Sequence, residues 1–386
     1  MPSPQPSSRA RGRWIAVAIG IVVAAGIGTL AAVLASSGGD EVTTNGTSQP
    51  PIEGPSPLYP LTSVDPSPPP APTLQVPQGG TYPDALTYVV SGDYPEWHVM
   101  RLDLKTGTNT TLFTADSGIA MSRGGSTIAY YSYRLKNGHV QKNKPSKGSY
   151  TRLLTVRDLD TGRNVVLGEA GSPHLSWDGT KIAVIAGSQQ VWGADLTEKH
   201  PKLHALTQPG EWQIFGWAGD RVLAFLKPPF RNYLISLQAQ VTEVATPNAI
   251  MWQPSPDGKW VFAIGHQGQA VFQPLAGGDP TIIDLGGWQI GKVYWTLDDR
   301  LFAPAATGQE VTAPATLLEM DPATGGLLEV PHTEDMVDVM PAMRGGSFAL
   351  ARGHFPPTWT ISDCLPAGRC HESGKVKIGA SFAQLR

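Results

Sequence analysis

The sequence repeats a short phrase, which reads SPDGKWVFAIG from Ser255 and SWDGTKIAVIA from Ser176. Shorter forms of the phrase recur along the chain, each with an apolar strand, a tight polar turn and a second strand that ends near an alanine. Successive alanines lie 39 to 54 residues apart, at Ala129, Ala183, Ala224, Ala263, Ala303 and Ala349. This spacing is the length of one four-stranded propeller blade. A blade cannot bury both faces alone, so the period predicts blades stacked around an axis.

The turns of the repeat fit this prediction. Asp-Gly and Thr-Gly pairs supply the positive φ that a two-residue hairpin requires. Each phrase is followed by a second strand pair around another turn, as in TVRDLDTGRNVVLG. No window beyond residue 80 shows a helical period of apolar residues. We therefore expect residues 81–386 to form an all-β propeller.

The number of blades follows from one incomplete repeat. Six copies of the phrase are complete, and DALTYVVSGDYPEWHVMRLDL, which begins at Asp84, adds a unit without an opening strand. The C-terminal end of the chain would supply that strand and close the ring, which removes the open sheet edges that promote aggregation. This arrangement favours seven blades of four strands over six.

The repeat resembles a known family. Ser255-Pro256-Asp257-Gly258 followed by KWVFA, together with DLDTG at 158–162, resembles the TolB-type β-propeller repeat, which also occurs in prolyl-oligopeptidase-like propellers. The resemblance covers roughly residues 82–386. It implies the propeller fold, with partner binding as the commonest use, and it does not imply an activity.

An uncharged segment precedes the repeats. Residues 14–35, WIAVAIGIVVAAGIGTLAAVLA, are long enough to cross roughly 30 Å of hydrocarbon as a helix. Three arginines precede the segment and two acidic residues follow it, which predicts a cytoplasmic tail at residues 1–13 and an extracytoplasmic propeller. The alternative is a signal peptide that is cleaved after Ala35. A stripe of small residues four apart would permit a helix-mediated dimer.

A linker joins this segment to the propeller. Residues 36–80 are rich in Pro, Ser, Thr and Gly and hold too few apolar residues to fold alone. We therefore expect a disordered tether that holds the propeller away from the membrane surface of a bacterial cell. The net charge of −3 and the pI near 6.3 give no reason to expect nucleic acid as the partner.

Cys364 and Cys370 are the only cysteines and flank LPAGR, the expected turn of the last hairpin. In an exported domain such a pair is normally oxidised, so we expect a disulfide. A redox or metal-binding pair is the alternative, but the C-x-x-C spacing is absent.

Catalytic motifs are absent from the sequence. There is no G-x-S-x-G elbow, and the propeller leaves no residues for a hydrolase domain. The histidines are scattered, and the Asp residues occupy turn positions where Asp bonds its own backbone. We expect no metal, no cofactor and no catalysis. A propeller enzyme such as a lactonase or a glycan-acting hydrolase, with its site in the central channel, remains an alternative, as does a structural or signalling ectodomain.

Four tryptophans recur near the first strand of successive repeats, at Trp177, Trp217, Trp252 and Trp295. We interpret them as packing residues rather than as a ligand cage.

One long loop is basic and aromatic. Residues 131–157 contain no acidic residue. By the repeat pattern the loop joins the second and third strands of a blade, so it lies opposite the Asp-Gly turns. Equivalent loops in two other blades carry further basic and aromatic residues. We expect this face to bind an acidic protein or an anionic envelope polymer. The candidate residues are Arg134, Lys136, Lys142, Lys144, Lys147, Tyr150, Lys227, Phe230, Arg231, His354 and Phe355.

Overall fold

The computed structural model describes residues 82–91, 96–145, 149–228, 230–244, 252–265, 268–290, 292–307, 316–331, 333, 336–341, 347–352, 358–365, 369–377 and 381–385. The predicted tail, membrane segment and linker, residues 1–80, lie outside the described residues. Within the described part, no helix is both long and apolar enough to span a bilayer.

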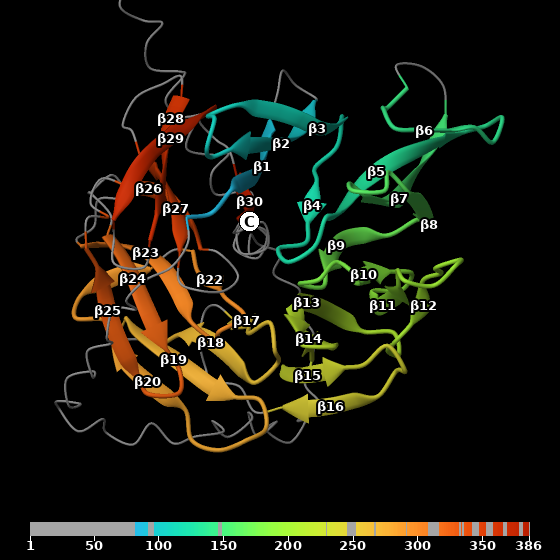
Figure 1. Cartoon of the computed structure of the whole chain (residues 1–386). Helices are drawn as coiled ribbons and strands as arrows, with labels where there is room; N and C mark the ends of the chain where they lie inside the picture. The colour runs from blue at the N-terminus through green and yellow to red at the C-terminus, as the bar shows by residue number, and fades with distance from the viewer. Residues whose placement is uncertain are drawn as a thin grey trace, which may run out of the picture. The chain divides into compact units, whose positions relative to one another are not determined.

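The described strands form seven sheets around a central axis, as Figure 1 shows. Blade 1 contains β30 (Ser381–Leu385), β1 (Ala85–Ser91), β2 (Trp97–Asp103) and β3 (Asn109–Ala115). Blade 2 contains β4 (Ala120–Met121), β5 (Thr127–Leu135), β7 (Tyr150–Asp158) and β8 (Asn164–Gly168), with β6 (Val140–Gln141) paired to β5. Blade 3 contains β9 (Gly171–Leu175), β10 (Lys181–Ala186), β11 (Gln190–Asp195) and β12 (His204–Ala205).

The other four blades follow the same order from the axis to the rim. Blade 4 contains β13 (Glu211–Ala218), β14 (Arg221–Lys227), β15 (Arg231–Ile235) and β16 (Val241–Val244). Blade 5 contains β17 (Trp252–Pro254), β18 (Trp260–Ile264), β19 (Gln269–Pro274) and β20 (Thr281–Asp284). Blade 6 contains β21 (Trp288–Ile290) and β22 (Tyr294–Trp295), both paired to β23 (Leu301–Thr307), then β24 (Thr316–Asp321) and β25 (Gly326–Val330). Blade 7 contains β26 (Met336–Pro341), β27 (Phe348–Arg352), β28 (Thr358–Cys364) and β29 (Cys370–Lys377).

The C-terminal strand closes the ring. β30 pairs antiparallel with β1, with Leu385 opposite Leu86 and Ser381 opposite Val89. The last strand of the chain therefore supplies the innermost strand of the first blade. This pairing confirms the predicted closure and the count of seven blades.

The repeated Ser-x-Asp-Gly phrase builds a capped turn between the first two strands of a blade. The Ser255 hydroxyl donates to the Asp257 carboxylate at 2.7 Å and accepts from the Trp260 backbone N–H at 3.0 Å. Gly258 takes φ +75°, which a residue with a side chain adopts only at a cost. Ser176 makes the equivalent bonds to Asp178 and Lys181. Because both serines are buried, the phrase recurs to satisfy polar groups at the ends of inner strands.

Two of the recurring tryptophans join neighbouring blades. Trp217 is 2% exposed, and its indole N–H donates to the His174 carbonyl of the preceding blade at 2.8 Å. Trp295 is 1% exposed and donates in the same way to the Gln253 carbonyl at 3.2 Å. These contacts confirm the packing role for Trp217 and Trp295.

Strand direction gives the ring two different faces. The turns between first and second strands lie on one side, which we call the turn face, and the loops between second and third strands lie on the other, which we call the loop face. Turns of neighbouring blades interlock on the turn face, where the Gly219 N–H donates to the Pro256 carbonyl at 3.1 Å. Lys259 of blade 5 bonds Asp299 of blade 6 at 2.8 Å on the same face.

The chain enters the propeller on the turn face. β1 holds the second position of its blade, so its first residues lie at the turn-face end, and β30 ends there as well. Tyr82, just before β1, packs edge-on against the His371 ring of blade 7 at 4.4 Å between ring centroids. The loop face therefore points away from the place where the preceding chain joins the propeller.

Candidate binding face

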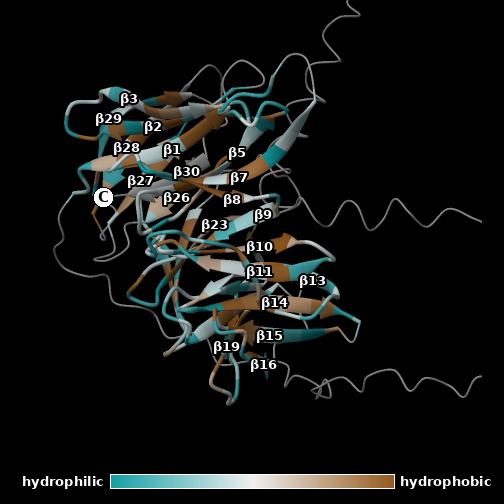
Figure 2. Ribbon diagram, turned by 90° about the vertical axis from the view of Figure 1, so that its right-hand side faces the viewer, coloured by the Kyte–Doolittle hydropathy of each residue, from teal (hydrophilic) through white to brown (hydrophobic). Residues whose placement is uncertain are grey.

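The longest hairpin of the described propeller lies on the loop face. β5 and β7 pair over nine residues each, from Thr127 opposite Asp158 to Leu135 opposite Tyr150, whereas the equivalent second strands of the other blades have five to seven residues. β6 pairs with the outer end of β5. Figure 2 shows β5, β7 and β8 between β1 of blade 1 and β9 of blade 3. The predicted position of this loop, opposite the Asp-Gly turns, is confirmed.

Five cations are exposed on the described part of this hairpin, and Lys144 is one of them. Arg134, Lys136, Lys142 and Arg152 are all exposed, and none of them forms an ion pair within the part of the chain that the structure describes. Asp116, from the preceding connection, contacts the hairpin and accepts a hydrogen bond from the Lys144 backbone N–H. The hairpin thus presents a local excess of positive charge on a protein whose net charge is −3.

Tyrosine rings pack against two of the cations on this hairpin. The Arg152 guanidinium lies 4.0 Å from the Tyr131 ring centroid, and the Lys144 ammonium lies 5.8 Å from that of Tyr150. Tyr150 in turn packs edge-on against Tyr133 at 5.2 Å. Burial raises the pKa of Tyr133, so its hydroxyl stays protonated at neutral pH. Each cation–π contact contributes about 0.5–1 kcal/mol at an exposed site, so the rings favour the positions in which these two cations lie.

Lys142 connects the hairpin to blade 1. Its ammonium lies 5.3 Å from the ring centroid of Phe113 in β3. This contact fastens the insertion to its neighbour and leaves the exposed ammonium available to an anion.

Blade 4 contributes the second part of the candidate site, at the turn between β14 and β15. Phe230 is 63% exposed at the tip of this turn. Lys227 lies with its ammonium 5.8 Å from the Phe225 ring centroid. Arg231 pairs with Glu243 at 2.8 Å, so its charge is compensated within the blade. This contact, together with charge attraction, raises the pKa of Arg231.

The candidate residues therefore do not form one cluster. Those of blade 2 and those of blade 4 share the loop face but have blade 3 between them. Lys147 on the β5–β7 insertion, and His354 and Phe355 between β27 and β28, lie outside the described residues.

Sequence reasoning missed a cluster at the axis. The Arg123 guanidinium of blade 2 lies 5.3 Å from the Trp177 ring centroid of blade 3 and 4.7 Å from that of Tyr294 in blade 6. The Lys292 ammonium also lies 4.7 Å from the Tyr294 ring. These residues are far apart in the sequence, and only the ring geometry brings them together. In the described residues, no group of three His, Cys, Asp or Glu side chains is placed to hold a metal.

A polar groove of about 420 Å³ runs between blades 2 and 3 on the turn face, and Asp158 and Asp178 line it. Both carboxylates cap their own turns: Asp158 accepts from the Asp160 and Thr161 N–H groups, and Asp178 accepts from Ser176 and Thr180. Burial alone would raise the pKa of Asp178, but these hydrogen bonds outweigh it and lower the pKa. The aspartates therefore fill the structural turn role that the sequence predicts.

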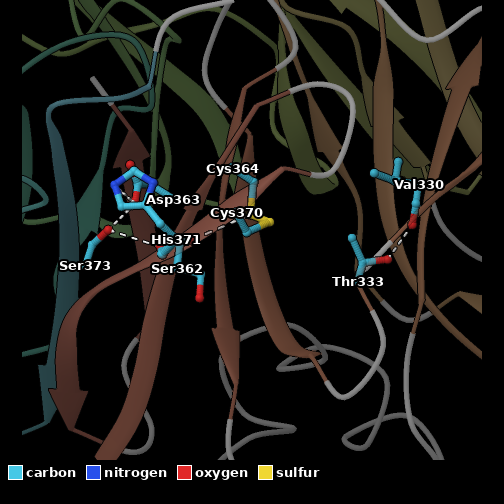
Figure 3. Close-up of a disulfide and its surroundings, with 8 residues drawn as sticks. All are labelled: Val330, Thr333, Ser362, Asp363, Cys364, Cys370, His371 and Ser373. Carbon is cyan, nitrogen blue, oxygen red and sulfur yellow. Dashed lines mark hydrogen bonds and ion pairs between the residues drawn. A yellow bond between two sulfur atoms is a disulfide. The ribbon is translucent and has the colours of Figure 1, made fainter.

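The predicted disulfide is present. Cys364 and Cys370 lie directly opposite each other on β28 and β29 and are bonded. Figure 3 shows Asp363 beside them, between His371 and Ser373. The same Asp363 oxygen contacts the His371 Nε2 at 3.1 Å and accepts from the Ser373 hydroxyl. Since Ser373 donates to the carboxylate and not to the imidazole, this trio lacks the bond that activates a serine nucleophile.

No protein-family model matches the chain, and no curated protein matches its sequence. Among solved structures, an oligogalacturonate lyase in complex with manganese is 13% identical, with 73% of this chain and 85% of the lyase covered and a TM-score of 0.50. A post-proline cleaving enzyme from Rickettsia typhi is 11% identical, with a TM-score of 0.51. That alignment covers 80% of this chain but only 54% of the enzyme, so the chain spans about half its length.

TolB from Acinetobacter baumannii is 14% identical, with 78% of this chain and 67% of TolB covered and a TM-score of 0.44. At such identities the likeness concerns the fold. The chain is a seven-bladed β-propeller, and the resemblance indicated by its repeats is confirmed at the level of the fold.

Proposed function

We propose that this protein is a membrane-tethered, non-catalytic recognition domain that binds an anionic partner outside the cytoplasm through its loop face. The observation that carries the proposal is the β5–β7 hairpin, with exposed Arg134, Lys136, Lys142 and Arg152 that have no ion pair among the described residues. Such a surface attracts negative charge and raises association rates.

The different use of the two faces supports this proposal. Turn-face contacts such as Gly219 with Pro256 and Lys259 with Asp299 join blades, whereas the long hairpin and the exposed Phe230 both lie on the loop face. A long insertion on a rigid scaffold is where binding residues commonly lie. The described chain enters the propeller on the turn face, at the opposite end of the blades from the loop face.

The axial cluster supports a role in recognition over turnover. Arg123, Trp177 and Tyr294 bring one cation and two aromatic rings together near the axis. This described cluster itself contains none of the carboxylates or histidines that a hydrolase would use. Binding without chemistry requires only the preformed surface described above.

The proposal predicts that charge reversal on the hairpin weakens anion binding. We expect the purified full-length Lys136→Glu/Lys142→Glu variant to bind poly-L-glutamate at least ten-fold more weakly than wild type, measured by biolayer interferometry. Wild-type affinity should also fall steeply as NaCl rises from 50 to 500 mM, because salt screens the attraction between exposed charges that lie farther apart than about 10 Å at 0.1 M, and this distance shortens as salt rises.

The matched control is Lys199→Glu/Lys202→Glu, which changes the net charge equally on exposed residues of the turn between β11 and β12. It should bind like wild type. If both variants bind poly-L-glutamate equally weakly, the loss of affinity reflects the net charge of the protein and not the hairpin, which would contradict the proposed site. Unchanged binding in the hairpin variant would also refute it.

A further inference from the structure

Phe230 occupies a backbone conformation that disfavours its side chain. It ends the turn between β14 and β15 with φ +66°, and its N–H donates to the Leu226 carbonyl at 2.9 Å. A positive φ is uncommon for any residue other than glycine and is a genuine outlier for a bulky one. Its ring is nevertheless 63% exposed, so burial does not offset the strain.

Three other turns of the same protein show what this position normally holds. In each, the fifth residue donates its N–H to the carbonyl four residues before, at 2.8 to 2.9 Å, as Phe230 does. The fifth residue is glycine in all three, with φ between +69° and +73°: Gly107, Gly162 and Gly325. The backbone of this turn type therefore favours glycine, and blade 4 carries phenylalanine in its place.

Aromatic rings lie beside Phe230 without covering it. Phe225 lies 6.2 Å from it between ring centroids and contacts Trp252 of blade 5 at 5.6 Å. Phe215 completes the cluster, 4.9 Å from Trp252. Phe230 therefore stands at the edge of an aromatic cluster that joins blades 4 and 5 on the loop face.

We propose that Phe230 is the anchor residue for a protein partner, in which it contacts an apolar or aromatic side chain that lies among acidic residues. A single exposed apolar residue is common on protein surfaces, but strained residues persist where the strain serves a function. Aromatic residues at the centre of an interface carry much of its binding energy.

The chemistry of the partner follows from the two parts of the loop face. Near Phe230, Arg231 is already paired with Glu243 and the Lys227 ammonium lies over the Phe225 ring. The exposed Phe230 ring therefore offers an apolar contact there. The exposed cations lie on the β5–β7 hairpin, two blades away. A segment that mixes acidic and aromatic residues fits both parts, whereas a purely anionic polymer fits only the hairpin. This inference rests on the proposed function, because the hairpin supplies the charge attraction.

The test uses two synthetic polymers and the purified full-length chain. Poly(Glu,Tyr) at a 4:1 ratio and poly-L-glutamate of the same length differ only in their tyrosines. Wild type should bind poly(Glu,Tyr) at least ten-fold more tightly than poly-L-glutamate. Phe230→Gly should abolish that gain and melt at or above the wild-type temperature because glycine suits φ +66°. Ile282→Ser, which removes a side chain that is 50% exposed on β20, should keep the gain.

The outcomes separate this inference from the proposed function. A tyrosine gain that persists in Phe230→Gly, or no gain in wild type, overturns the anchor while hairpin-dependent binding of poly-L-glutamate still stands. A lower melting temperature for Phe230→Gly would instead assign Phe230 a packing role and also overturn the anchor. Failure of wild type to bind either polymer overturns the proposed function itself.

Discussion

At the residue scale, the protein relies on short polar side chains that close the inner turns of its blades. Ser255 and Ser176 each bond the Asp two residues later and a backbone N–H five residues later. A buried N–H without a partner costs about 1–3 kcal/mol, so each of these two serines removes such a penalty from its blade. This requirement explains why the two repeats share the serine and the aspartate although most of their other residues differ.

His174, on the inner strand β9, gives the fold a pH dependence. His174 is partly buried, and the hydration that its imidazolium loses there lowers its pKa to about 4 from an ordinary value of 6.5. The unfolded chain takes up a proton near pH 6.5, whereas the folded chain does so only near pH 4. The contribution of His174 to the free energy of unfolding is therefore fully present above pH 6.5. It is lost as the pH falls toward 4, and the loss amounts to at most about 3 kcal/mol.

Urea unfolding at pH 7 and pH 4.5 measures this effect. His174→Leu should lose less stability over this interval than wild type does, and the difference between the two isolates His174 from the carboxylates that titrate in the same range. Parallel losses in both proteins would show that His174 is not the group responsible.

At the element scale, the disulfide secures the outermost hairpin of blade 7. Cys364 and Cys370 close the turn between β28 and β29. Next to this turn, His371 of β29 packs against Tyr82, which lies just before β1. A short cross-linked loop contributes about 2 kcal/mol by limiting the unfolded chain.

The Cys364→Ser/Cys370→Ser variant should therefore unfold with a free energy about 2 kcal/mol below that of wild type. Guanidinium unfolding with and without dithiothreitol measures it. Wild type should move to the level of the variant in reductant, and the variant should not respond. A variant as stable as the oxidised wild type would contradict the stabilising role of the bond.

Some features of the strands and loops follow from the sequence and others do not. Strand positions and the face of the β5–β7 hairpin follow from hydrophobic alternation and turn residues, which are local signals. The stacking of Arg152 on Tyr131 depends on cross-strand register and side-chain placement, and the pairing of Arg231 with Glu243 joins two strands. These interactions decide which charges are available to a partner, and neither is encoded in a local pattern.

At the scale of the whole molecule, the repeat period predicts a ring and the incomplete first unit predicts its closure, as β30 shows. The axial contacts of Arg123 with Trp177 and Tyr294 were beyond prediction, because they join blades 2, 3 and 6. Contacts across the ring join residues that are far apart in the sequence. No local pattern therefore indicates which of them will meet. For the same reason the sequence suggested one candidate face, where the structure separates it into two parts.

Hydrogen–deuterium exchange of the full-length chain, with and without poly(Glu,Tyr), tests the central claim most directly, because it locates the bound surface along the chain. The account predicts slower exchange in segments of the loop face, at residues 131–152 and 224–233, and unchanged exchange in the turn-face segments 176–180 and 255–259. Protection confined to the turn-face segments, or spread equally over both faces, would contradict it.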